Sequence, residues 1–491
     1  MKSLVILIIC LPTQSSAQTS EKEFLSFSDA VNNLALHSQR AQSAWLQYDN
    51  AKLTYDNYKK SFLPQLRINL KPITFNHAMK LLQDPYSGEY RNIEDFANTS
   101  IATLTISQKV GPTGGILSAT TGLSYLHEFT NHRDNYSSTP FYVSYSQQII
   151  GGFRSYMQEK KVSRLQYELA AMTVCQALAR EQCEVARLYI SACLALLRKE
   201  QAMKDIEAED SLLFYARIRH ENGYITDYDM TQIRLEHLQA IYTQAQYAAH
   251  AKEALHSLAL RLGCQNENLS IFIPNTDALP SLLIEAEVKM QARQNNPEYK
   301  SAELRRTQAI KNLHHRKLAN RFNASVSLSY GLNQYANTLC GAYQHPNQQQ
   351  SVGLTLSIPV FDWGISRNQR RMAENDFDEE TILIEESCRM ADNEIITRTM
   401  NYNLASSQYE ISREQYKLAI EQYSQLISKF SQGSASVYEL ISANRAKQNT
   451  LINHMNVVRA LFDEYYTIQQ LTLYNFCENR RLSEVYGIKI D

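Results

Sequence analysis

The stretch that decides the fold occurs twice, as RHENGYITDYDM at residues 219–230 and as KFSQGSASVYEL at residues 429–440. With an offset of 210 positions, Gly223 corresponds to Gly433. Glycine tolerates the left-handed conformation that ends many helices. In both stretches a hydroxyl residue follows the glycine, and an acid follows that hydroxyl after three residues, which is the capping box that begins a helix. Each stretch therefore predicts a helix, a tight turn and a second helix.

The equivalent positions of the two stretches keep their chemistry, which indicates an internal duplication. The pairs are Arg219 and Lys429, Gly223 and Gly433, Thr226 and Ser436, Asp229 and Glu439, and Met230 and Leu440. Asp229 is expected to be a weaker member of its capping box than Glu439.

Long helices are predicted on both sides of each turn, because residues 141–273 and 360–491 contain no proline. A proline in a helix interior costs about 3 kcal/mol. The predicted helical hairpins cover residues 155–262 and 365–476. At 1.5 Å per residue, the helix before the first turn would be roughly 100 Å long. The last helix has apolar residues at spacings of four and three, which predicts coiled-coil packing; they are Leu451, Met455, Val458, Phe462 and Tyr465.

Composition excludes several classes of protein. The 491 residues carry a net charge of -1, which argues against nucleic acid as a partner. No hydrolase, nucleotide-binding or dinucleotide-binding motif is present, so neither an enzyme nor a cofactor is expected. His314 and His315 are adjacent, hence about 100° apart on a helix, and do not form a metal pair.

Residues 1–17 have the pattern of a secretory signal peptide, with Lys2, an apolar run and small residues before Gln18. No later apolar run reaches the 18 residues that a spanning helix needs, so membrane insertion would require a β-barrel. Seven cysteines follow the signal without CxxC spacing, and they are expected to be mostly buried free thiols.

The chain is predicted to contain two structural repeats, residues 18–273 and 274–491. Each has a helix, at 26–61 and at 281–318, the second interrupted at Asn296 and Pro297. Strands with alternating polar and apolar residues are expected within 64–150 and 323–360.

The first repeat carries about 48 additional residues, within 76–138. They include two more alternating stretches, Ile101 to Val110 and Ile116 to Tyr125. Either an extra hairpin or an enlarged surface loop would explain them, and the pattern leaves both open.

The strand-to-helix segment of the second repeat adds a specific motif, formed by Pro359, Phe361, Asp362, Trp363 and Gly364. Together with the duplicated turns and the signal peptide, it resembles the TolC-like family of outer-membrane efflux proteins. The resemblance implies a mainly α protein with a membrane β-barrel portion, in which a homotrimer combines a long coiled-coil α-barrel with strands from each chain.

By the same resemblance, the protein would lie in the outer membrane, among its lipids, and extend into the periplasm. It would be the passive exit duct of a tripartite efflux or type I secretion system. Its partners would be a periplasmic membrane-fusion adaptor and an inner-membrane pump of the RND or ABC type. The alternative is a periplasmic coiled-coil adaptor or scaffold without a pore.

The resemblance also places the two turns at the periplasmic tip, where gating and adaptor docking would occur. The residues concerned are Gly223, Thr226, Asp229, Gly433, Ser436 and Glu439. The two acids would either complete helix caps only, or also form a cation-selective gate.

The tip departs from the family pattern at Phe430, Ala435 and Ser442, where some members carry a tyrosine, an arginine and an acid. Arg234 and Arg445 are therefore candidates for the charges of the gate region.

Overall fold

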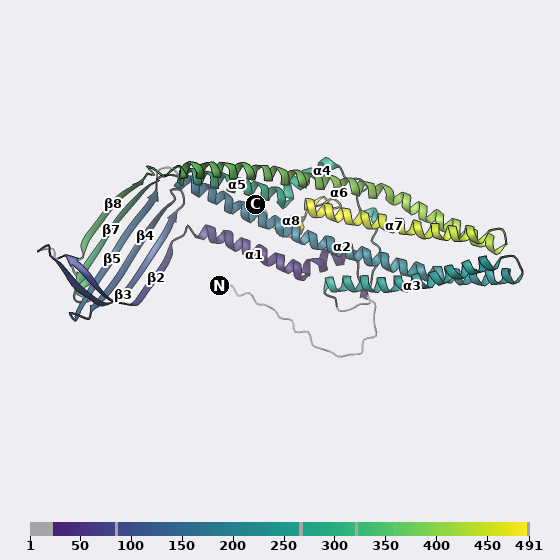
Figure 1. Cartoon of the computed structure of the whole chain (residues 1–491), viewed down its shortest axis with the longest axis horizontal. Coiled ribbons are helices and arrows are strands. Elements are labelled where there is room, and N and C mark those ends of the chain that lie inside the picture. The colour runs from purple at the N-terminus through teal and green to yellow at the C-terminus, as the bar shows by residue number, and fades with distance from the viewer. Residues whose placement is uncertain (1–22, 84–86, 265–268, 320–322, 359, 489–491) are drawn as a thin grey trace. The chain divides into compact units, whose positions relative to one another are not determined.

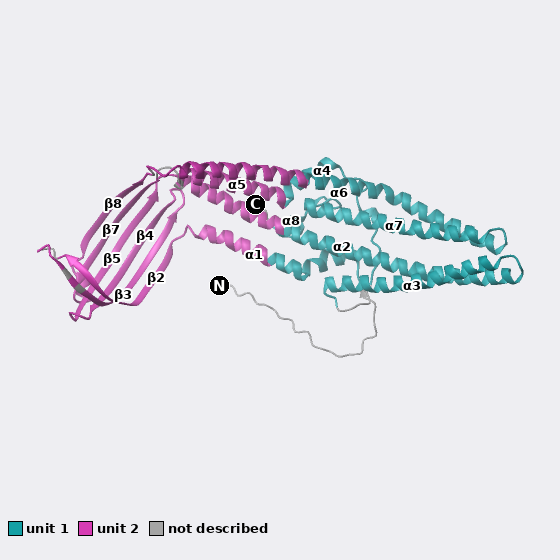
Figure 2. Cartoon of the chain, in the orientation of Figure 1, with its two compact units in different colours: residues 1–45, 174–296, 392–489 teal, residues 46–173, 297–391, 490–491 magenta. Residues whose placement is uncertain are grey.

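The computed structural model describes residues 23–83, 87–264, 269–319, 323–358 and 360–488 (Figure 1). The predicted signal peptide and Pro359 lie outside these ranges. Figure 2 shows two compact units, here called the helical unit (1–45, 174–296 and 392–489) and the sheet unit (46–173, 297–391 and 490–491). Among the described residues, no helix has the length and apolar character needed to cross a bilayer.

Four long helices dominate the chain: α2 (Gly152–Glu221), α3 (Asp227–Leu262), α6 (Ile365–Ser431) and α7 (Val437–Thr472). α2 and α6 end 210 positions apart, α3 and α7 begin 210 positions apart, and they also end 210 positions apart. The duplication inferred from the two turns therefore extends along both second helices.

The helices that precede the strands are interrupted at equivalent places. In the first repeat a π-helix (Asp29–Leu34) and a short 3-10 helix (Ala35–His37) come before α1 (Gln39–Lys60). In the second, α4 (Glu285–Asn295) comes before α5 (Pro297–Ala319). Ser38 and Asn296, 258 positions apart, are both extended, with ψ of 157° and 128°.

The two interruptions have different chemical causes. Pro297 disfavours a helical conformation for the residue before it. Ser38 instead begins a new helix, since its Oγ accepts a hydrogen bond of 3.2 Å from the Ala41 N–H. The interruption at Asn296 was expected from the proline, whereas the one at Ser38 was not.

The sheet unit contains one antiparallel sheet with strand order β2-β3-β4-β5-β7-β8. The strands are β2 (Gln65–Gln83), β3 (Tyr90–Val110), β4 (Gly115–Glu128), β5 (Arg133–Gln148), β7 (Asn323–Ala336) and β8 (Asn347–Ser357). The additional residues of the first repeat thus form most of β3 and β4, which is the hairpin of the two alternatives rather than an irregular loop.

The remaining elements are short. They are β1 (Glu23–Phe24), β6 (Leu269–Ser270), β9 (Tyr474–Asn475), β10 (Arg480–Arg481), α8 (Leu482–Val485) and two 3-10 turns at Thr276–Ala278 and Gly341–Tyr343.

The core of the helical unit is built on α2 and α7, and it contains the predicted stripe. All five stripe residues, from Leu451 to Tyr465, are buried, which confirms the coiled-coil prediction for this helix. The first four of them pack in one cluster with α2 side chains such as Tyr189 and Leu194, and Phe27 contacts Tyr189 edge-on.

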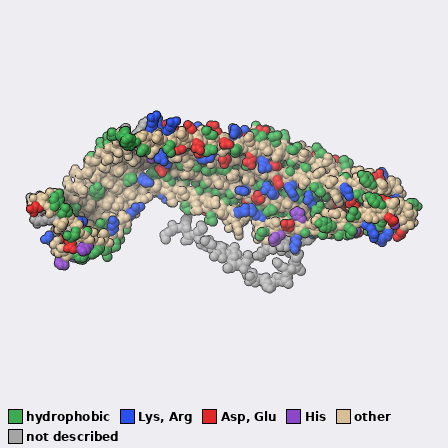
Figure 3. Space-filling view, in the orientation of Figure 1, with side chains coloured by type: hydrophobic (Ala, Val, Ile, Leu, Met, Phe, Trp, Pro, Cys, Tyr) green, Lys and Arg blue, Asp and Glu red, His purple; other side chains and the backbone are tan. Residues whose placement is uncertain are grey.

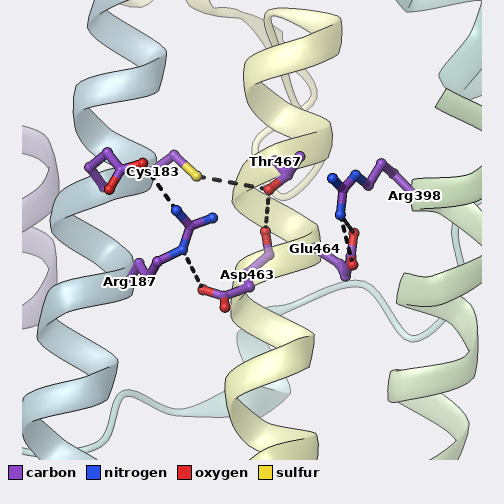
Figure 4. A network of polar contacts seen from close by, with 7 residues as sticks. Cys183, Arg187, Arg398, Asp463, Glu464 and Thr467 are labelled. Carbon is purple, nitrogen blue, oxygen red and sulfur yellow. Dashed lines mark hydrogen bonds and ion pairs between the residues drawn. The ribbon is translucent and has the colours of Figure 1, made fainter. Parts of the chain in front are cut away.

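Polar contacts flank this core (Figure 4). Arg187 of α2 pairs with Asp463 of α7 at 3.3 Å, and Arg398 of α6 pairs with Glu464 at 3.2 Å. The Cys183 thiol lies 3.9 Å from the Thr467 hydroxyl. These contacts link α7 to α2 and to α6.

The seven cysteines that follow the predicted signal are free thiols, as expected. Cys175, Cys183 and Cys193 are buried in α2. Cys340 and Cys477 differ from the prediction, because they lie in turns and are exposed.

Candidate functional site at the two helical turns

The first turn joins α2 to α3 through a left-handed glycine. Gly223 has φ of 75°, its N–H donates to the His220 carbonyl at 2.9 Å, and the Tyr224 N–H donates to the Arg219 carbonyl at 2.9 Å. This pair of bonds is a Schellman motif, which satisfies carbonyls at the end of a helix. The glycine C-cap predicted from the sequence is confirmed.

α3 then begins with a complete capping box. The Thr226 hydroxyl accepts from the Asp229 N–H at 3.1 Å, and the Asp229 carboxylate accepts from the Thr226 N–H at 3.1 Å. The aspartate therefore completes its capping box.

The second turn repeats this geometry between α6 and α7. Gly433 has φ of 84°, and the N–H groups of Gly433 and Ser434 donate to the Phe430 and Lys429 carbonyls at 3.0 and 2.9 Å. Ser436 and Glu439 form the second capping box, with distances of 3.2 and 2.9 Å. The bonds from Ser436 hold the pKa of Glu439 below its usual value, so this carboxylate is charged at neutral pH.

A shared apolar cluster holds the two turns together. It contains residues from all four long helices and the second turn: Leu212, Ala216, Ile233, Tyr423, Phe430, Ala435, Val437, Leu440 and Ala443. Phe430 is 1% exposed, and Ala435 is buried as well. Two of the departures from the family pattern are therefore apolar core positions here.

Arg219 connects the ends of α2 and α6. Its Nη1 donates to the Phe430 carbonyl at 2.9 Å, and its guanidinium lies 4.6 Å from the centre of the Phe430 ring. A cation near the last carbonyls of a helix is favourable. This contact was not predicted. The basic residues in the last turns of α2 and α6, Arg219 and Lys429, were the sequence feature that could have indicated it.

A buried polar layer follows the turns along α2 and α7. Lys447 Nζ pairs with Asp205 at 2.7 Å and lies 4.3 Å from the centre of the Tyr423 ring, while Asn444 donates to Glu209 at 2.9 Å. This layer was not predicted from the sequence. Its signal is that Asn444 and Lys447 occupy positions of the stripe between Leu440 and Leu451.

Next to this layer is a pocket of about 210 Å³, lined among others by Asp205, Glu209, Glu236 and Asn444. Glu209 is 2% exposed, and its Oε2 has no hydrogen-bond partner within the described part of the chain. Burial, and then the nearby Glu236, raises the pKa of Glu209 to about 7, although Lys447 opposes the shift. No group of acids, histidines and cysteines among the described residues could hold a metal ion.

The two candidate gate arginines have different environments. Arg445 pairs with Glu236 of α3 at 2.6 Å, so it links α7 to α3 within one chain. Arg234 is exposed on α3. Among the ion pairs of the described residues, none joins Arg234 or Arg445 to Asp229 or Glu439.

The strand-to-helix motif lies between β8 and α6. Asp362 caps α6 by accepting from the N–H groups of Gly364 and Ser366 at 3.1 and 2.8 Å. Phe361 and Trp363 are exposed, with ring centres 4.7 Å apart, and Trp363 and Gly364 both have positive φ. Exposed aromatic residues at the end of a strand are typical of a membrane interface.

The surface near the turns combines charges with exposed aromatic side chains. Figure 3 shows acidic and basic side chains interspersed along the helices. Tyr224, Tyr228 and Tyr438 are 74%, 69% and 78% exposed. Tyrosine is enriched in protein interfaces because it presents a large, rigid apolar surface with a polar end.

Comparison with known proteins identifies a family model that matches part of this chain. Residues 289–472 match the family model described as outer membrane efflux protein. No curated protein matches the chain.

Solved structures agree with this match over nearly the whole length. A membrane protein from Pseudomonas aeruginosa shares 15% identity, with a TM-score of 0.66 and coverage of 93% of this chain and 92% of that one. The CmeC outer membrane channel of Campylobacter jejuni shares 14% identity, with a TM-score of 0.64 and coverage of 94% and 88%. At these identities the solved structures establish the fold.

Proposed function

Since this chain belongs to the outer membrane efflux protein family, we propose that it is the exit duct of a tripartite export system and that its two helical turns form the periplasmic mouth. The protein is a non-enzymatic efflux channel of the outer membrane that extends into the periplasm. Membership in this family excludes the alternative of a scaffold without a pore. The trimer, the partners and the roles of individual residues belong to the proposal.

A single observation carries the role of the turns. Two equivalent turns, far apart in the sequence, share one apolar cluster, and each carries a capping acid, Asp229 in the first turn and Glu439 in the second. Acid side chains repeated around a symmetric assembly select for cations and repel each other. The turns therefore have the chemistry for a narrow, charged mouth.

The trimer is supported by an apolar stripe on α3. Leu235, Leu238 and Tyr242, at spacings of three and four, are 66%, 62% and 59% exposed. Such a stripe on a long helix is normally covered. A neighbouring copy of the chain would cover it, as α2 covers the stripe of α7.

Docking to an adaptor is supported by the exposed tyrosines. A photo-crosslinking residue at Tyr228 or Tyr438 should capture a periplasmic adaptor. Mass spectrometry would identify this adaptor, and the gene next to that of the adaptor would identify the pump. The matched control is Tyr335 of β7, which is 72% exposed in the sheet unit. Capture of the same protein from all three positions, or of no adaptor from the turns, would contradict the docking role.

The gate is tested without disturbing the caps. In Asp229→Asn and Glu439→Gln the amide oxygen can still accept the capping bonds, while the charge is lost. We expect the cation-over-anion permeability ratio in planar bilayers to fall toward one. Glu253→Gln, at an exposed acid 24 residues further along α3 and hence about 36 Å away, is the control. Unchanged selectivity in both turn variants would leave the acids as caps only.

A further inference from the structure

We propose that β3 and β4 are strands of the membrane wall, so that each chain contributes six strands and the trimer closes an eighteen-stranded barrel. This inference rests on the proposed function, from which it takes the trimer. What it adds is the position of the extra hairpin, which could equally lie outside the membrane, and hence the width of the pore.

An apolar row of residues crosses the sheet. Backbone pairing connects Leu66 to Ile106, then Ala119, Val143 and Tyr330. These residues come from β2, β3, β4, β5 and β7 in turn, and the row ends at Gln350 of β8. Residues that pair across neighbouring strands point to the same face. The apolar face of β5 and β7 thus continues without interruption over β3 and β4.

The adjacent row of residues is polar in all six strands. It consists of Gln65, Ser107, Ser118, Ser144, Ser329 and Ser351. The hydroxyls of Ser118 and Ser144 are 2.7 Å apart, so β4 and β5 share this face. Successive residues of a strand point to opposite faces, and one face apolar with the other polar is the pattern of a wall between lipid and water.

The charges of β2 and β3 are unevenly distributed. His77 pairs with Glu94 at 2.6 Å, and Lys80 pairs with Asp95. These four residues lie in the outer parts of β2 and β3, which are the parts nearer to the Gln83 and Tyr90 ends of the two strands. The inner parts pair from Gln65 to Lys71 and from Ile101 to Ser107. On the apolar face these parts carry Leu66, Ile68 and Leu70 against Ile106, Leu104 and Ala102. The two charged residues of these inner parts, Arg67 and Lys71, lie in phase with Gln65, on the polar face. A hydrated loop would have no reason to keep its charges off one face.

The two edge strands of the sheet expose apolar side chains. β2 and β8 each have one neighbour within the described sheet. On β2, Leu66, Ile68 and Leu70 are 63% to 67% exposed, and on β8, Val352 and Leu354 are 81% and 69% exposed. A lipid-exposed edge would leave backbone groups without hydrogen bonds, which closed barrels avoid. A second copy of the chain is the occupant that fits, because β8 of one copy can pair with β2 of the next around a ring.

The consequence is a wider lumen. Barrel diameter grows roughly in proportion to the number of strands. Six strands from each of three copies give a diameter about one and a half times that of a trimer with four strands per copy. Barrels of about this size leave an aqueous channel.

The test measures contact with lipid at matched positions. Trp45 and Trp363, the two tryptophans of the chain, are replaced by phenylalanine. Single tryptophans are then placed at Ile106 and Ser107 of β3, and at Val143 and Ser144 of β5, in the full-length channel reconstituted into vesicles with brominated or ordinary phospholipid. Val143 lies in the row of Ile106, and Ser144 lies in the row of Ser107.

We expect brominated lipid to remove as large a share of the emission in Ile106→Trp as in Val143→Trp, and much less in Ser107→Trp and Ser144→Trp. Leu104→Trp and Thr105→Trp form a second pair if the first does not assemble. Strong loss of emission in Val143→Trp with little loss in Ile106→Trp and Leu104→Trp would place the hairpin outside the membrane. That result would overturn this inference and leave the proposed function standing. Little loss in Val143→Trp itself would overturn the membrane wall, and with it the proposed function.

Discussion

Helices α3 and α7 occupy equivalent positions in the two repeats, and yet one is largely exposed where the other is buried. Both begin with a capping box and both have 36 residues. α7 buries its stripe from Leu440 to Thr472, whereas the buried residues of α3 are Ile233, Ala251, Leu258 and Ala259. The same capping residues therefore produce the same turn, while the burial of the helix that follows depends on which segments pack against it.

The difference is also visible at single positions. Lys447, which is buried against Asp205, corresponds to His237, which lies 3.5 Å from the exposed Asp210. Glu209 of α2 corresponds to the buried Ala419 of α6. The duplication thus kept the turn and lost the symmetry of the polar layer.

Breaking the buried pair should have the largest effect. Lys447→Ala leaves Asp205 in the interior without its cation, which is expected to cost about 3–5 kcal/mol. His237→Ala, at the equivalent position of α3, should cost no more than about 1 kcal/mol, because Asp210 is solvated. Thermal unfolding of the detergent-purified trimer, followed by circular dichroism, compares the two variants. Equal losses would mean that the two hairpins are energetically alike.

The next effect depends on pH and on Glu209. Because its pKa is raised to about 7 in the folded protein, the folded state holds a proton that the unfolded state releases near pH 4.3. Stability from this group is fully present below that pH and is lost as pH rises through about 7. The loss is at most about 4 kcal/mol, from 1.36 kcal/mol per pKa unit.

Glu209→Gln should remove this slope, so that its unfolding midpoint between pH 5 and pH 8 changes less than that of the wild type. Asp205, Glu236 and Lys447 also face the site. Asp210→Asn, which alters an exposed acid of the same helix, is the control and should keep the wild-type slope. If stability still falls with rising pH in Glu209→Gln, another titratable group causes the pH dependence.

The smallest effect should be equal in the two hairpins. Thr226→Ala and Ser436→Ala each remove the hydroxyl of a capping box, and each should cost about 1 kcal/mol. Native-state hydrogen exchange at the first turns of α3 and α7 would measure both. A clearly larger loss for one variant would show that its turn carries strain or contacts beyond the cap.

Local features of the chain were predictable because their physics lies within a few residues. The glycine caps, both capping boxes and the α7 stripe are encoded by neighbours at most one or two turns apart. The interruption at Ser38 was not predicted, since a serine before a helix pattern is compatible with both a cap and a continuous helix. Arg219 with Phe430, and Lys447 with Asp205, join residues more than 200 positions apart.

The sequence by itself determined the duplicated helical hairpins and the alternating strands, because backbone sterics, capping and residue periodicity act over short range. Only the tertiary structure decided that residues 76–138 form two strands in phase with the rest of the sheet, and which polar residues of α7 are buried. Register and burial depend on which segments meet across long stretches of chain, and no local pattern specifies that partner.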